Sequence, residues 1–117
     1  MEPTRLTQRV ACELENPANE LWLSPITIWE VLVLAEKRRV IFNPDALTWI
    51  RNALRTTPLK EAPLNYEVAI QSRTIDFYHQ DPVDRFLAAT ALVYELTLVT
   101  ADERLLGSRK FSTLANK

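Results

Sequence analysis

The sequence predicts an α/β domain in which helices cover a central parallel sheet. Strand and helix signals alternate along the chain, which is typical of parallel strands joined by crossover helices. Two strand candidates, "ELWLS" (20–24) and "LTLVT" (96–100), are too apolar for strands with one face in water. The chain has 117 residues, enough for one compact domain and too few for two ordinary ones. We therefore expect a single domain over residues 1–117.

Five helices are expected from apolar periodicity and capping residues. "TRLTQRVACELE" (4–15) has apolar residues at spacings of four, which predicts an amphipathic helix. Ser24-Pro25 is a favourable helix start, and the helix over 26–39 should end in a basic last turn that suits the helix dipole. The other helices are expected over 45–55 after Asn43-Pro44, over 66–73 with Asn65 as N-cap, and from Asp81-Pro82 to about Glu95.

Two further strands are short, one within "TPLKEAPL" (57–64) and one at an edge around Phe111. Ligands of parallel α/β sheets collect beyond the carboxyl ends of the strands. Asp102 follows the strand 96–100 at that edge, and the helix that carries Glu30 begins there, after the strand 20–24. This edge is therefore where a site is expected.

Composition excludes several classes of function. The net charge of −1 argues against a globally basic nucleic-acid binder, and a single glycine, Gly107, leaves no glycine-rich phosphate loop. One cysteine, Cys12, forms no disulfide within the chain and fits a reducing compartment. No apolar run approaches the ~20 residues of a membrane span. A cytoplasmic protein is expected.

Glu30 is the only charged residue between Ile26 and Ala35. A carboxylate in so apolar a segment is expected to be partly desolvated, which is costly unless it is compensated. The simpler explanation is an exposed glutamate or a partner for an arginine.

Three aspartates are each explained equally well by helix capping when taken alone. Asp81 is a natural N-cap before Pro82, Asp84 would then be the third helical residue, and Asp102 could cap the turn "ERLL". Together with Glu30, however, they place acids from three strand–helix junctions on one edge of one sheet. Converging carboxylates need a cation, and hard divalent cations such as Mg²⁺ or Mn²⁺ suit oxygen ligands and phosphate substrates.

The remaining candidates have better structural explanations than functional ones. His79 is expected to be plain loop surface, and Cys12 to be core. Trp22, Trp29 and Trp49 should fill the core or a partner interface rather than stack bases. Six basic residues could contact an anionic backbone, although solvated surface is the better explanation for any single one. They are Arg38, Arg39, Arg85, Arg104, Arg109 and Lys110.

"ELWLSPITIWEVLVLAEKRRV", "HQDPVDRFLAATAL" and "LTLVTADERL" together resemble a PIN domain. More closely, they resemble the VapC-type toxin ribonucleases of bacterial toxin–antitoxin pairs. The resemblance runs from about residue 3 to about residue 107. It implies a three-layer α/β/α sandwich with a central parallel sheet, and cleavage of RNA by water activated on Mg²⁺ or Mn²⁺. By position, the resemblance assigns the metal and the catalysis to Glu30, Asp84 and Asp102, with Asp81 as a frequent companion.

The resemblance also implies partners, and the sequence departs from the family pattern at one place. It implies an RNA substrate, a cognate antitoxin and a homodimer. Family members begin with a buried strand that ends in an aspartate, and "MEPTRLTQRV" does not match that strand. We therefore expect the sheet to lack its first strand, and expect lower stability and little or no ribonuclease activity.

Three functions remain open. The chain is a VapC-type ribonuclease, a catalytically inactive PIN relic that binds a protein, or an unrelated α/β binding module whose acids are only helix caps. The sequence does not identify the RNA target, the antitoxin or the oligomeric state.

Overall fold

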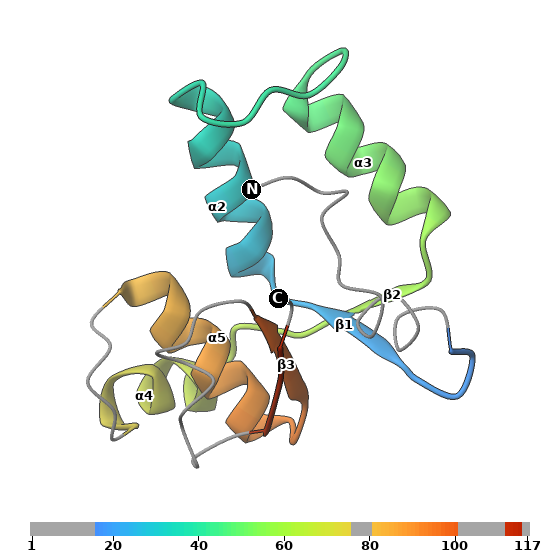
Figure 1. Cartoon of the computed structure of the whole chain (residues 1–117). Coiled ribbons are helices and arrows are strands. Elements are labelled where there is room, and N and C mark those ends of the chain that lie inside the picture. The colour runs from blue at the N-terminus through green and yellow to red at the C-terminus, as the bar shows by residue number, and fades with distance from the viewer. Residues whose placement is uncertain (1–15, 76–80, 101–111, 116–117) are drawn as a thin grey trace.

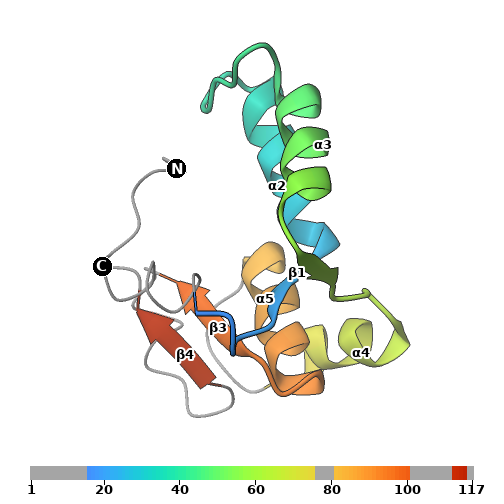
Figure 2. The same cartoon turned by 90° about the vertical axis from the view of Figure 1, so that its right-hand side faces the viewer.

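The structure, a computed structural model, describes residues 16–75, 81–100 and 112–115. The elements in chain order are β1 (Leu21–Leu23), α2 (Pro25–Glu36), α3 (Ala46–Thr56), β2 (Leu59–Glu61), α4 (Tyr66–Thr74), α5 (Pro82–Val93), β3 (Thr97–Thr100) and β4 (Ser112–Ala115). The helices α2 and α3 pack side by side at one end of the molecule, and α4, α5, β3 and β4 form the other end (Figures 1 and 2).

The strands pair in parallel, as expected. β1 pairs with β2, with Leu21 opposite Leu59, and β3 pairs with β4, with Thr97 opposite Ser112. The α/β class is therefore confirmed. The described strands form two separate pairs rather than one continuous sheet, because no strand among these residues joins β1 to β3.

Side-chain caps begin the helices at the expected places. The Ser24 hydroxyl accepts a hydrogen bond from the Ile26 backbone N–H at 3.2 Å, and Asn65 Oδ1 accepts one from Val68 at 3.0 Å. The third predicted helix begins one residue later than expected, because Asp45 is its N-cap and accepts from the Thr48 N–H at 2.8 Å. These bonds satisfy backbone donors that the first helical turn leaves unpaired.

The end of α2 differs from the prediction. The helix stops at Glu36, so its last turn contains no basic residue. Arg38 adopts a left-handed conformation with φ of 56° and donates its N–H to Ala35 O, while Arg39 donates to Leu34 O. This pair of hydrogen bonds is a Schellman motif, which closes a helix and reverses the chain. The basic residues therefore follow the helix instead of ending it.

The core lies between α4, α5 and β3. Ile75, Ala88 and Ala91 form a buried cluster, and Leu98 of β3 packs against it. Tyr94 at the end of α5 stacks on Trp22 of β1, with ring centroids 5.9 Å apart. It also donates its hydroxyl to Pro63 O at 2.8 Å. The aromatic contact connects α5 to β1. Because β1 leads directly into α2, this contact joins the two ends of the molecule.

Large apolar side chains on α2 and α3 remain exposed among the described residues. Trp29 and Leu47 are 55% and 52% exposed, and Trp49 packs against Phe42 while staying 40% exposed. Ile50 is the one buried residue of α3. Trp29 and Trp49 therefore do not lie in the core, because these helices contribute few side chains to it, and their alternative place at a partner interface stays a prediction.

Several predictions lie outside the described residues. These are the helix 4–15 with Cys12, the loop residue His79, and Asp102. The predicted edge strand around Phe111 corresponds to β4, which begins at Ser112. No helix in the described ranges is long and apolar enough to cross a membrane.

Candidate functional site

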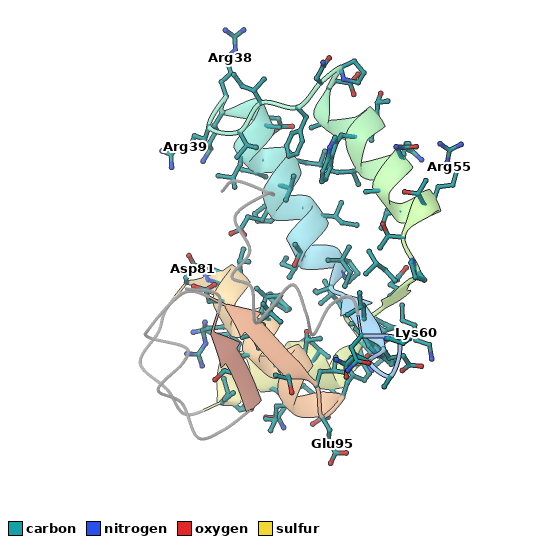
Figure 3. All side chains as sticks on the ribbon, turned by 45° about the vertical axis from the view of Figure 1, so that its right-hand side comes forward. Arg38, Arg39, Arg55, Lys60, Asp81 and Glu95 are labelled. Carbon is teal, nitrogen blue, oxygen red and sulfur yellow. The ribbon has the colours of Figure 1, made fainter. Side chains whose placement is uncertain are left out.

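The first turn of α5 carries two of the predicted acids. Asp81 is the N-cap, as expected from Asp81-Pro82, and its Oδ1 accepts from the Val83 and Asp84 N–H groups at 2.9 and 3.3 Å. Figure 3 shows Asp81 at this helix start. Pro82 fits the first helical position because it has no N–H to satisfy.

Asp84 is the third residue of α5 and is half-buried. Its backbone N–H is occupied by the Asp81 cap, and its side chain lies in the first turn, where the positive end of the helix dipole favours an anion. The predicted helical position of Asp84 is therefore confirmed.

Glu30 lies in the middle of α2 and is half-buried among apolar neighbours. Burial raises the pKa of the Glu30 carboxyl above its ordinary value, and the negative charges of Asp84 and then Asp81 raise that pKa further. A carboxylate raises the pKa of another carboxyl group mainly at short range, so this shift indicates that Asp84 and Asp81 lie near Glu30. The fold thus brings acids from α2 and α5, more than fifty residues apart in the sequence, into one region.

The described acids do not by themselves form a complete metal-binding group. Within residues 16–75, 81–100 and 112–115, no three His, Cys, Asp or Glu side chains are arranged to hold an ion. Glu30 and Asp84 would supply two carboxylates from two helices, and Asp102 lies outside these residues. The donor set itself suits a hard divalent cation, because all of these groups are carboxylate oxygens.

Arg85 contradicts its expected place on the surface. Its side chain is 5% exposed, and its Nε donates to Ser72 O at 2.7 Å and its Nη2 to Ile75 O at 2.9 Å. The prediction that it contacts an anionic backbone is wrong, because its guanidinium is directed into the α4–α5 interface. No local pattern in the sequence indicates this contact, because the acceptors Ser72 and Ile75 lie 13 and 10 residues before Arg85.

Other basic residues fit the expected surface. Arg38 and Arg39 extend from the end of α2 away from the body of the molecule (Figure 3), and both are exposed. Lys60 instead forms an ion pair with Glu20 at 2.9 Å and lies 5.4 Å from the centre of the Trp22 ring. Arg104, Arg109 and Lys110 lie outside the described part of the chain.

Comparisons with known proteins place the chain among related sequences. The family model of the PIN domain matches residues 2–109. Ribonuclease VapC22 of Mycobacterium tuberculosis (strain ATCC 25618 / H37Rv) is 32% identical over 111 residues, an alignment that covers 92% of this chain and 82% of that protein. No solved structure gives a significant match.

Proposed function

The chain belongs to the PIN domain family, and we propose that it is a metal-dependent ribonuclease of the VapC toxin type. The relative that it matches is itself a ribonuclease, and the match extends over nearly the whole chain. The observation that carries the proposal is the proximity of Glu30 to Asp84, which raises the pKa of Glu30. Two acids that repel one another and come from separate helices are poorly explained by helix capping alone.

A divalent cation accounts for this arrangement. Glu30, Asp84 and Asp102 would hold Mg²⁺ or Mn²⁺, and the bound ion would activate the attacking water and stabilise the leaving oxygen. Asp84 lies in the first turn of α5, where the helix dipole favours a negative charge, and Glu30 is half-buried on α2. Asp81 has a different role, because its oxygen is engaged as the helix cap.

The experiment is an RNA cleavage assay with the purified chain, with Mn²⁺, with Mg²⁺ and with EDTA. We expect cleavage that requires the metal and falls at least a hundredfold in Glu30→Gln and Asp84→Asn. Glu36→Gln is the matched control, because Glu36 is an exposed acid on the same helix. Cleavage that persists in EDTA, or that both site variants retain, would contradict the proposal.

The main alternative is an inactive PIN relic that binds a protein. The exposed apolar side chains of α2 and α3 favour a protein partner in either case. We propose that this partner is a small antitoxin and that the chain forms a homodimer in the cytoplasm, where its RNA substrate would be found. A folded chain that binds its partner but shows no metal-dependent cleavage under any condition would support the relic. The expectation of little or no activity competes with this proposal, and the rate of RNA cleavage by the wild-type chain in Mn²⁺ decides between the two.

A further inference from the structure

Arg85 is a buried cation whose hydrogen-bonding partners are at the end of another helix. Its guanidinium donates to Ser72 O at 2.7 Å and to Ile75 O at 2.9 Å. These carbonyls belong to the last turn and the C-cap of α4, where the helix dipole is negative. A buried charge is stable only when it is well paired, and a forked guanidinium can satisfy two carbonyls at once. Arg85 therefore caps the C-terminus of α4 from α5.

The backbone of Arg85 is connected equally closely to the acidic turn. Its N–H donates to Asp81 O at 3.0 Å, which closes the first turn of α5. Asp84 is its immediate neighbour, and Ala88, one turn further along, packs against Ile75 in the core. The face of α5 that bears Arg85 and Ala88 is thus fixed against α4. Rotation of α5 about its axis would strain the two guanidinium hydrogen bonds.

Successive residues of a helix project about 100° apart, so Asp84 and Arg85 point in different directions. Side-chain ends lie about 5–6 Å from the helix axis, so a rotation of about 20° would move the Asp84 carboxylate by about 2 Å. Metal–ligand distances vary by only about 0.2 Å. A small rotation of α5 would therefore be enough to disrupt ligation.

We propose that Arg85 is a positioning residue that fixes the rotation of α5 and thereby the direction in which Asp84 faces Glu30. The inference rests on the proposed function in one respect, namely that these two carboxylates hold the metal. It assigns no contact between Arg85 and RNA. A hydrogen-bonded anchor on α4 thus controls the geometry of a carboxylate on α5.

The test compares Arg85→Lys with the wild-type chain. Lysine keeps the positive charge but cannot donate to both carbonyls in the geometry of a fork. Arg73→Lys is the matched control, because Arg73 is an exposed arginine of α4. If Arg85→Lys does not fold, Arg85→Gln, which is neutral and can still donate to one carbonyl, gives the same measurements.

Two quantities are measured well below each variant's melting temperature. The first is Mn²⁺ affinity, by electron paramagnetic resonance. The second is the repulsive coupling free energy between Glu30 and Asp84 in metal-free protein. It is obtained from the free energies of unfolding in urea of the chain, Glu30→Gln, Asp84→Asn and the double variant. This coupling does not depend on any ribonuclease activity, and a uniform loss of stability would not change it.

We expect the Arg85 variant to bind Mn²⁺ at least tenfold more weakly and to lose at least half of the coupling, with neither change in Arg73→Lys. An unchanged coupling overturns the proposal whatever the affinity. Wild-type Mn²⁺ affinity in the Arg85 variant also overturns it. If the wild-type chain binds no Mn²⁺ while the coupling still falls, the proposed metal function fails and the positioning of Asp84 by Arg85 is supported.

Discussion

The carboxyl group of Glu30 on α2 lies close enough to Asp84 on α5 for the charge of Asp84 to raise its pKa. Burial is the larger cause of the shift, and Asp81 adds a smaller contribution. Without a cation, this arrangement disfavours the folded state whenever the acids are ionised. The metal-free protein should therefore show a pH dependence of stability that originates in the site.

The first prediction concerns this pH dependence. The folded-state pKa of Glu30 is above its unfolded value, so the folded chain retains the proton over a pH range in which the unfolded chain has lost it. The free energy of unfolding should therefore fall as the pH rises above the ordinary glutamate pKa and through the raised one. Glu30→Gln should remove that loss and melt higher than wild type at pH 7 without metal, with the difference vanishing near pH 3.

Thermal melting from pH 3 to pH 8 in EDTA measures this, with Glu36→Gln as the control. Equal melting curves for wild type and Glu30→Gln at every pH would show that Glu30 is not perturbed by its neighbours.

The second prediction separates the cap from the charge at Asp81. Asp81→Ala removes the acceptor for the Val83 and Asp84 N–H groups and should lower the free energy of unfolding by about 1 kcal/mol. Asp81→Asn keeps a good cap and should be nearly as stable as wild type. Urea unfolding of the two variants is the measurement. A loss of similar size in both variants would mean that the charge, rather than the cap, stabilises α5.

The third prediction concerns two helix ends that use a non-glycine residue in the left-handed region. Arg38 has a φ of 56° after α2, and Glu95 has a φ of 55° after α5. This conformation costs an L-residue roughly 1–2 kcal/mol, and glycine avoids that cost. Glycine also loses more conformational entropy on folding, which offsets part of the gain. Arg38→Gly and Glu95→Gly should each raise the free energy of unfolding by up to about 1 kcal/mol.

Arg39→Gly is the control for these substitutions, because Arg39 is next to Arg38 but does not have a positive φ. It should be neutral or destabilising. Stabilisation by Arg39→Gly equal to that of Arg38→Gly would show that the backbone conformation is not the cause.

The fourth prediction concerns the exposed apolar side chains of α2 and α3. Trp29→Ser and Leu47→Ser should change the free energy of unfolding by less than about 0.5 kcal/mol, because both side chains are more than half exposed. They should nevertheless weaken self-association or antitoxin binding, which light scattering and a binding titration measure. Tyr66→Ser, at a 91% exposed position on α4, is the control. A large loss of stability with unchanged association would mean that these residues serve the fold instead.

Local chemistry made much of the fold predictable from the sequence. Ser24, Asn65 and Asp81 are small polar residues that compete for helix N–H groups, so they marked helix starts correctly. The end of α2 was harder to place, because Arg38 closes it without the glycine that usually marks such a stop. Trp29 and Trp49 were expected in the core or at an interface, and only the packing of whole helices against one another could show that the core does not receive them.

The candidate site was predictable in part. The apolar surroundings of Glu30 indicated desolvation, and the structure shows its pKa raised by burial. The buried role of Arg85 could not be read from its neighbours, because arginines are usually exposed and its acceptors, Ser72 and Ile75, are ten or more residues away.

The most direct test of the central claim is the position of a bound ion. Crystals of the chain soaked in MnCl₂ and measured at the manganese absorption edge should give an anomalous peak. We expect this peak about 2–2.3 Å from carboxylate oxygens of Glu30 and Asp84, a typical metal–oxygen distance. A fully occupied peak elsewhere, or no peak near these two carboxylates at saturating Mn²⁺, would contradict it.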